Sequence, residues 1–496
     1  MKKIYIYTLA TLTLWGAASC KKPNDFGKTN IDPGATSTPV VSALLASAEL
    51  SVANYASTNA YSINSGYYAQ YFSESQYPGT SLYTNPQTDF TGTYNGTLYD
   101  LQNVINLNQD KNSVAVAKIL QSYVFWVLTD SFGDVPYSQA LLGIKSITPA
   151  YDKQEDIYKG LLTTLTAAVA SMDGGTVPGD LYYGGSAAKW KKMANSLKLL
   201  IAIQASRAPG NDFAKAAFVE ASASALITDN ADNFTLVYPG GGSYNSPWYN
   251  LYNGRTDVGE SKTMTDMTAT LNDGRTVPFG GSFSDPKQTT GGIETSNIGI
   301  PAGLDRTPVL AFITANPTWA LVLRADYRTN GAGETVPVIT ASEVLLALAE
   351  GANIGWIPVT NMVTNYQDGI KRSFEQWGVD APPAGYFTNA KVAISAAATG
   401  YKTTNGVNIA VQQWIASYPN GHMAWNVWRK TSSPALVPTT YASNTSKQIV
   451  RRFTYAIAES TTNPNGVKAA VARETGLNPG TDSQDNLVWW DPGLGK

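Results

Sequence analysis

Apolar side chains recur at helical spacing over much of this chain. Between Ser113 and Asp130, apolar residues stand at positions 116, 119, 120, 123 and 127, which is the i, i+3, i+4 pattern of one helix face. Residues 190–201 repeat this spacing, with lysines on the other faces. Shorter patterns of the same kind predict helices over 40–56, 154–171, 212–226 and 361–377. The chain is therefore expected to be mainly helical.

The clearest predicted helix start lies at Thr340. Its hydroxyl can accept a hydrogen bond from the amide of Glu343 while the Glu343 carboxylate bonds back, which is a capping box. Ile339 and Val344 stand at the positions of a hydrophobic staple. We expect a helix from 341 to about 350.

Residues 238–335 differ from the helical stretches on both sides. Glycine pairs and a glycine triplet interrupt this region repeatedly. Stretches of this length without regular structure are usually functional or disordered. The tryptophans and tyrosines here favour a packed, functional region. The helix pairs around it indicate an α-solenoid or a bundle, although tetratricopeptide signature residues do not recur about every 34 residues.

Composition and charge narrow the classes of ligand. Of the 496 residues, 15% are charged and 11% are aromatic, and the net charge is −2. No run of basic residues occurs, which argues against nucleic-acid binding. The many hydroxyl, amide and aromatic side chains favour an uncharged, hydroxyl-rich ligand.

The N-terminus has the pattern of an export signal. A short basic start and an apolar stretch lead to small residues and to Cys20, the chain's single cysteine. Cys20 is placed like the lipidated cysteine of a bacterial lipobox, although Ala17 stands where leucine is commonest; the alternative is an ordinary signal peptide. We expect residues 1–19 to be removed and 20–38 to form a flexible lipidated stalk. No later apolar run reaches the roughly 18–20 residues of a spanning helix, so the lipid is the expected membrane contact.

Candidate catalytic and metal-ligating residues are few. The single histidine, His422, follows a Pro-Asn-Gly turn sequence and is expected to be a solvated loop residue. Glu343 and Glu350 stand two helical turns apart, but capping accounts for Glu343 and the pair is not expected to catalyse glycoside hydrolysis. One Cys and one His exclude a zinc site built from these residues. No catalytic residue, metal or cofactor is predicted.

Three further polar segments have structural explanations. Asp134 follows a helix-ending glycine and precedes Val135-Pro136, so it is expected to order a turn. Residues 229–233 lack the glycine of a calcium-binding loop and are expected to form a turn. The glycines at 240–242 lack the following Lys-Ser/Thr of a phosphate-binding loop.

Several segments follow motifs that occur together in one known family. Thr129–Tyr137 matches the pattern TD-x-[FW]-GDVPY, and Lys189–Lys198 matches KW-x-K-x-ANSLKLR. Further matches cover 340–350, 366–379, 413–436, 451–463 and 489–491. With these segments in consistent order, the chain resembles the SusD/RagB family of outer-membrane nutrient-binding lipoproteins from Bacteroidetes.

The resemblance implies both a fold and a role. The fold is mainly α, with tetratricopeptide-like helix pairs forming an α-α superhelical scaffold and a large loop-rich, ligand-facing region. One SusD-like domain is implied over 39–496, with scaffold at about 39–237 and 336–430, the loop-rich region at about 238–335 and an irregular C-terminal segment at 431–496. The implied role is a non-enzymatic, lipid-anchored protein of the outer membrane, facing the cell exterior. It captures oligosaccharide, or sometimes peptide, and delivers it to a SusC-like TonB-dependent transporter.

Loop aromatics are the predicted ligand contacts, because sugar C–H faces stack on flat rings while amides bond to hydroxyls. The candidates are Tyr77, Tyr83, Tyr94 and Asn95 in the first loop-rich stretch and Trp248, Tyr249, Tyr252 and Trp319 in the second. Two alternatives stay open. One is a helical glycoside hydrolase that acts on the same ligands, and the other is a surface module that binds peptide or protein through a flat aromatic patch.

Overall fold

The computed structural model describes residues 39–84, 88–282, 295–328 and 332–493. The chain divides into two compact units, 1–40 and 41–496, and the second contains nearly all of the described residues. The predicted signal peptide, Cys20 and the stalk lie outside the described residues. Within the described ranges, no helix combines the length and the apolar character needed to cross a membrane.

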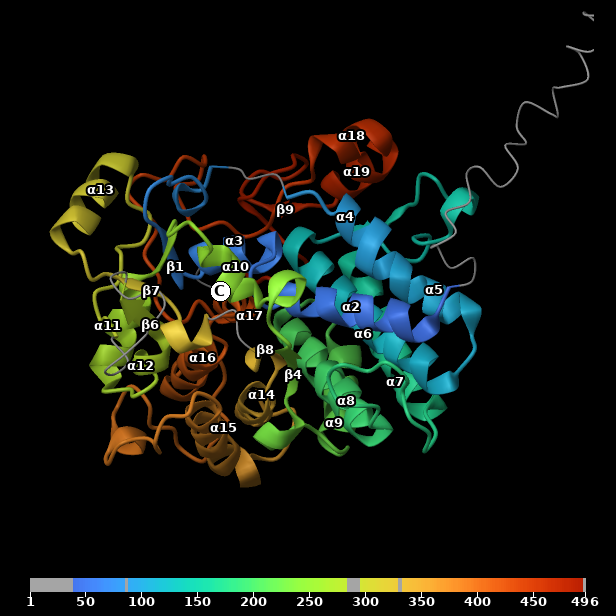
Figure 1. Ribbon diagram of the computed structural model, residues 1–496, viewed down its shortest axis with the longest axis horizontal. Helices are drawn as coiled ribbons and strands as arrows, with labels where there is room; N and C mark the ends of the chain where they lie inside the picture. Colours follow the sequence, from blue (N-terminus) through green and yellow to red (C-terminus); the bar gives the residue numbers. More distant parts are fainter. Residues whose placement is uncertain (1–38, 85–87, 283–294, 329–331, 494–496) are drawn as a thin grey trace, which may run out of the picture. The chain divides into compact units, whose positions relative to one another are not determined.

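Helices dominate this unit (Figure 1). In chain order they are α2 (Val41–Tyr55), α3 (Ala60–Tyr68), α4 (Thr91–Thr93), α5 (Tyr99–Leu107), α6 (Lys111–Phe132), α7 (Gln154–Ser171), α8 (Ala187–Gln204), α9 (Asp212–Ser222), α10 (Pro247–Tyr252), α11 (Lys262–Leu271), α12 (Thr276–Phe279), α13 (Arg306–Ala315), α14 (Ala341–Asn353), α15 (Met362–Gln376), α16 (Thr404–Ala416), α17 (Gly421–Thr431), α18 (Ile457–Thr462) and α19 (Pro464–Val471). Each helix predicted from apolar spacing is present.

The strands are short, each with two to six residues. They are β1 (Phe72–Glu74), β2 (Val135–Pro136), β3 (Tyr151–Asp152), β4 (Phe234–Tyr238), β5 (Val258–Glu260), β6 (Gly280–Ser282), β7 (Ala320–Val322), β8 (Glu334–Ile339), β9 (Thr475–Gly476) and β10 (Asn486–Leu487). Four of them form an antiparallel sheet in the order β1-β5-β7-β6, and β2-β3, β4-β8 and β9-β10 form two-stranded sheets.

Consecutive helices pack against each other as pairs and the pairs stack. Helix α6 packs on α7, α8 on α9, α14 on α15 and α16 on α17, while α7 contacts α8 and α14 contacts both α8 and α16. One large core of buried apolar side chains runs through these layers. This arrangement confirms the mainly α fold built from helix pairs.

Local sequence signals set the ends of these helices. The Asp110 carboxylate accepts a hydrogen bond from Ser113 N at 2.6 Å at the start of α6, and Gly133 ends the helix with φ +84°. The predicted capping box at Thr340 is present, with Glu343 N donating to Thr340 Oγ1 at 3.2 Å and Thr340 N donating to the Glu343 carboxylate at 2.9 Å. Capping therefore accounts for Glu343.

Residues 238–335 contain more regular structure than their sequence suggests. Helices α10 to α13 and strands β5 to β7 lie in this region, and β1 from far earlier in the chain completes their sheet. Figure 1 shows the sheet beside α11, α12 and α13, at the end of the unit away from α5 and α7. A small second core lies here, formed by Ile300, Val309, Trp319 and Leu321.

The expectation of a solvated His422 is wrong. His422 is 1% exposed and lies in the first turn of α17, where Asn420 accepts a hydrogen bond from Met423 N at 3.3 Å as the helix cap. A side chain at Gly421 would overlap the Ser62 carbonyl oxygen, so glycine is needed for the close packing of α17 on α3. The turn-like residues before His422 are therefore a helix start pressed against another helix.

This buried imidazole predicts a pH dependence of stability. Burial, and then the charge of Arg429, lower the pKa of His422 to about 3, from 6.5 in an exposed histidine. Below pH 6.5 the unfolded chain binds a proton that the folded chain rejects. The free energy of unfolding should therefore fall as the pH falls towards 3, by at most about 1.4 kcal/mol per pH unit from this group.

The measurement is direct because the chain has one histidine. In NMR spectra of the imidazole, we expect no titration between about pH 8 and 5. The variant His422→Gln should lose this one-proton contribution to the pH dependence of urea unfolding. An imidazole that titrates near pH 6.5 in the folded protein would contradict the prediction.

Candidate functional site

Three of the predicted contact residues have rings that pack inside the protein. Tyr83, Trp248 and Trp319 are 2%, 1% and 3% exposed. The Tyr83 ring meets Tyr68 edge-on, the Trp248 ring meets Phe72 edge-on, and Trp319 belongs to the second core. Tertiary packing covers these rings, so they offer no face to a ligand in this structure.

Two other predicted residues have contacts that hold the structure together. The Tyr252 hydroxyl donates to Val258 O at 2.7 Å and accepts from Val322 N at 2.9 Å, which ties α10 to strands β5 and β7. Tyr77 is exposed, but the Arg306 guanidinium lies over its ring, 4.9 Å from the ring centre. Tyr249, which precedes these strands in α10, is half-buried.

Tyr94 and Asn95 are brought together at one cavity of about 280 Å³. It lies between their π-helical turn (Tyr94–Leu98), the loop after β2 and helix α18. The Tyr94 hydroxyl donates to Pro136 O at 2.5 Å, whereas the Asn95 side chain is exposed. The cavity is separate from α10, so the two predicted groups of contacts do not form one site.

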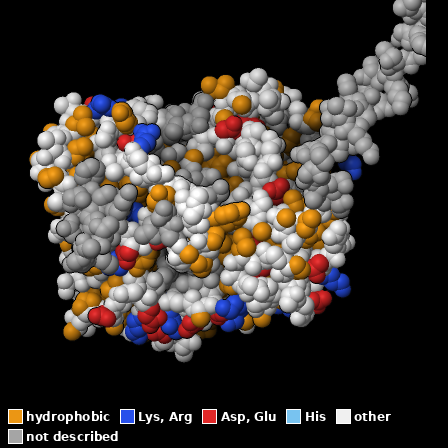
Figure 2. Space-filling view, viewed as in Figure 1, with side chains coloured by type: hydrophobic (Ala, Val, Ile, Leu, Met, Phe, Trp, Pro, Cys, Tyr) orange, Lys and Arg blue, Asp and Glu red, His pale blue; other side chains and the backbone are white. Residues whose placement is uncertain are grey.

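A different groove lies between α2 and α10, and most of the residues that line it are neutral and polar. We call it the amide groove; it has a volume of about 450 Å³. It is lined by Leu50, Ser51, Asn54, Thr58, Asn59, Tyr238, Tyr244, Asn245, Pro247 and Asn250. None of these lining residues is charged. Figure 2 shows the face that carries α2 and α10, and its densest group of charged side chains lies along the lower edge, away from these helices.

Two buried polar atoms of the amide groove lack partners. Among the described residues, neither the Tyr238 hydroxyl nor Asn245 Oδ1 has a hydrogen-bond partner. Burial also raises the pKa of Tyr238, so its hydroxyl keeps its proton. Tyr244 is 54% exposed beside them and presents a ring to solvent. Because buried polar groups are nearly always hydrogen-bonded, each of these two atoms still requires a hydrogen-bond partner.

The local sequence explains how the groove is built. Strand β4 ends at Tyr238, and Gly240, Gly241 and Gly242 all have positive φ, between 64° and 75°, which turns the chain back at once. Ser246 then caps α10 by accepting from Trp248 N at 3.3 Å. The buried Trp248 fixes this helix in the core, so its role is to position the neighbouring groove residues.

Sequence reasoning missed the groove residues because their types are common. Tyr244, Asn245 and Asn250 flank the aromatic residues that the sequence singled out, and they meet Asn54 and Asn59 only in the folded chain. The sequence feature that could have indicated these residues is the group of asparagines after the glycine turn at 240–242. That signal does not say which residues face one groove.

The carboxylates considered for catalysis have structural partners. Glu350 forms an ion pair with Lys430 at 2.6 Å, and it accepts hydrogen bonds from Tyr401 and Gln413, each at 2.7 Å. Asp134 accepts from Gln154 N at 2.8 Å and pairs with Arg473 at 2.6 Å, as expected for a residue that orders a turn. Among the described residues, no group of three or more His, Cys, Asp or Glu side chains has the arrangement of a metal site.

Comparison with known proteins gives consistent results. The model of a SusD-like family, described as starch-binding and associating with the outer membrane, matches residues 33–456. A solved chitin-binding protein is 26% identical, with a TM-score of 0.73 over 92% of this chain and 100% of that one. A chitin-binding SusD homologue from Flavobacterium johnsoniae is 22% identical, with a TM-score of 0.76 over 91% and 98% of the two chains.

A SusD homologue from Bacteroides ovatus is also 22% identical, with a TM-score of 0.74 over 91% of this chain and 99% of that one. At this identity, the likeness to the two homologues shows a shared fold. No curated protein matches the chain.

Proposed function

This chain belongs to the SusD-like family, and from that premise we propose that it binds a neutral oligosaccharide in the amide groove. The groove residues carry no charge, and two of their buried polar atoms lack partners, which suits a ligand whose hydroxyls donate and accept. The exposed Tyr244 ring supplies a flat face for a sugar ring. The structural roles of Glu343 and Glu350 favour binding over hydrolysis.

Delivery to a membrane transporter is the second part of the proposal. The family description of association with the outer membrane fits a lipid on Cys20, a stalk over 20–38 and a binding domain that faces the cell exterior. A SusC-like TonB-dependent transporter would then receive the ligand. Acyl groups on Cys20 in the native protein, and a barrel protein that co-purifies with it, are the expected findings.

Substitutions in the groove test the binding site. Tyr244→Ala and Asn245→Ala should each weaken oligosaccharide binding about tenfold, because each removes one ring or hydrogen-bond contact worth about 1 kcal/mol or more. Isothermal titration of starch- and chitin-derived oligosaccharides, with peptides as the alternative class, measures this. Tyr441→Ala is the matched control, since Tyr441 is 45% exposed and does not line the groove.

The same titrations separate the possible outcomes. Binding that is equally weakened by Tyr441→Ala would mean that the effect is not local to the groove. Oligosaccharide binding unaffected by both groove variants would exclude the amide groove as the site. Binding of peptides alone would replace the oligosaccharide by the alternative ligand class.

A further inference from the structure

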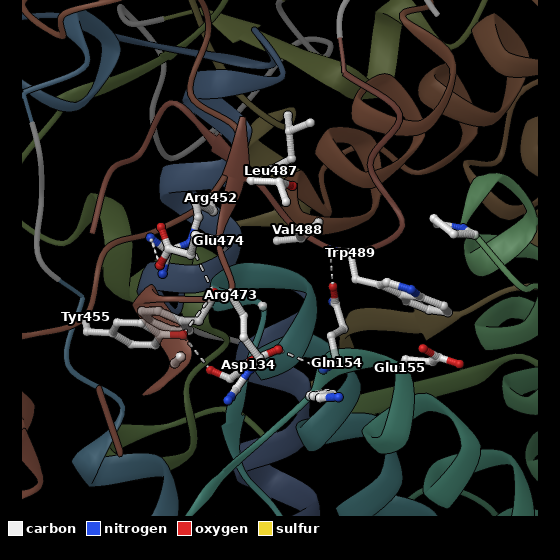
Figure 3. Close-up of a pocket in the computed structure, with 16 residues that line it drawn as sticks. Asp134, Gln154, Glu155, Arg452, Tyr455, Arg473, Glu474, Leu487, Val488 and Trp489 are labelled. Atoms are coloured by element: carbon white, nitrogen blue, oxygen red, sulfur yellow. Dashed lines mark hydrogen bonds and ion pairs between the residues drawn. The ribbon is translucent and has the colours of Figure 1, made fainter. Parts of the chain in front are cut away.

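A cavity of about 240 Å³ lies where distant parts of the chain meet, and it shares no residue with the amide groove. Residues 132–134 and 153–155 form one part of its lining, and residues between 452 and 489 form most of the rest (Figure 3). We call it the C-terminal cavity. Three of the segments that carry the family resemblance, 129–137, 451–463 and 489–491, contribute to it, yet the proposed function does not use them.

One wall of the C-terminal cavity has a buried donor and a buried carboxylate oxygen that make no hydrogen bond with the described residues. Arg452 is 1% exposed, and its Nε and Nη1 donate to Phe132 O at 3.1 Å and Asp482 Oδ1 at 2.7 Å. Its Nη2 has no hydrogen-bond partner among the described residues. Glu474 Oε1 lies 2.9 Å from Arg452 Nη1 but lacks hydrogen-bond geometry, while Oε2 accepts from Asn486 Nδ2 at 2.7 Å. A buried donor and a buried acceptor therefore stand side by side.

The opposite side of the C-terminal cavity is aromatic. Figure 3 shows Trp489 across the cavity from Arg452 and Glu474, with Gln154 between them. Trp489 N donates to Gln154 Oε1 at 2.7 Å, and the indole stacks on Phe213 at an interplanar angle of 17°. The half-buried indole also meets the Tyr158 ring edge-on, so two ring contacts hold this wall in place.

The charges around the C-terminal cavity balance. The lining residues include the cations Lys153, Arg452 and Arg473 and the acids Asp134, Glu155 and Glu474. Each acid has a cationic partner, since Asp134 pairs with Arg473, Glu474 with Arg452, and Glu155 with Lys159 at 2.6 Å. Equal numbers of cations and acids give the site no strong preference for an ionic ligand of either sign.

We propose that the C-terminal cavity is a second sugar site, which takes one uncharged pyranose ring. A sugar hydroxyl both donates and accepts, so two neighbouring hydroxyls satisfy Arg452 Nη2 and Glu474 Oε1 together, while the ring lies against Trp489. The volume is below the range of about 300–1,000 Å³ of sites for drug-sized ligands, which fits a single ring. This goes beyond the amide groove and relies on the proposed function only for the class of ligand.

The test observes Trp489 directly in the full-length protein. The chain is labelled with 5-fluorotryptophan, and the Trp489 signal is identified by its loss in Trp489→Phe. Titration with glucose, galactose and N-acetylglucosamine should shift this fluorine signal for at least one sugar. The variant Glu474→Gln should weaken that response about tenfold or more, whereas Tyr244→Ala should leave it unchanged.

The results of this titration distinguish failure of the second site from failure of the amide groove. A Trp489 signal that moves with none of the sugars, or moves equally in Glu474→Gln, overturns the second site. If oligosaccharides still bind in a manner that depends on Tyr244, the amide groove stands and the second site alone fails. Should Glu474→Gln fail to fold by circular dichroism, crystals of the unaltered protein soaked with the same sugars decide, and an empty C-terminal cavity overturns the proposal.

Discussion

Replacing Arg275 with methionine should lower the free energy of unfolding by about 3–5 kcal/mol, because it leaves a carboxylate unpaired in the core. Arg275 and Asp273 are both fully buried and form a two-pronged ion pair, with distances of 3.0 and 2.7 Å. The guanidinium also donates to Ser373 at 2.9 Å and to Gln412 at 3.0 Å. Although burial raises the pKa of Asp273, the Arg275 charge holds it below its usual value.

The double variant Asp273→Asn/Arg275→Met is the control for this prediction. It removes both charges, so it should be more stable than Arg275→Met alone, even though the hydrogen bonds to Tyr386 and Gln412 change. Urea unfolding followed by circular dichroism measures both variants. If the single variant is as stable as the double one, the cost of an unpaired buried charge does not explain the loss.

Replacing Trp490 with alanine should also cost about 3–5 kcal/mol, because it empties a large volume in the core. Trp490 is completely buried near the C-terminus, and its indole Nε1 donates to Asp130 Oδ1 at 2.8 Å. The Arg429 guanidinium lies over the same ring, 4.6 Å from its centre. The variant therefore loses packing, a hydrogen bond and a cation–π contact at once.

Two milder variants separate these contributions. Trp490→Phe keeps most of the packing and removes one donor from Asp130, so it should cost about 1–3 kcal/mol. Leu477→Ala lies in the same C-terminal segment but is 64% exposed, and it should change the stability by less than about 0.5 kcal/mol. Urea unfolding measures all three. A loss with Leu477→Ala as large as with Trp490→Ala would contradict a role for core packing.

The resemblance motifs could be recognised from the sequence, but their physical roles could not. Asp130, from the segment 129–137, accepts hydrogen bonds from Tyr158, Asn426 and Trp490, residues that come from three distant parts of the chain. Nothing in the local spacing of these residues indicates that they meet. The structure shows that the motifs join the C-terminal segment to helix α6.

The candidate site was less predictable than the fold, because it also depends on residues that are far apart in the sequence. Trp248 was chosen as an aromatic in a loop, yet it anchors α10 in the core, and the neighbouring Tyr244 and Asn245 face the amide groove. The local sequence of a loop does not determine which of its aromatics becomes covered. His422 is a second example. Its local sequence predicted an exposed turn, yet the residue lies buried in the first turn of α17.

By itself, the sequence determined where several of the longer helices lie and how the helix after Thr340 begins, since apolar spacing and capping depend on residues within a few positions of each other. The capping box at Thr340 and the helix over 113–130 are examples. The tertiary structure alone decided which polar groups are buried without partners and which surfaces remain open. Those properties arise when Tyr238 and Asn54 come to line one groove, or Arg452 and Trp489 one cavity, across chain distances that no local pattern encodes.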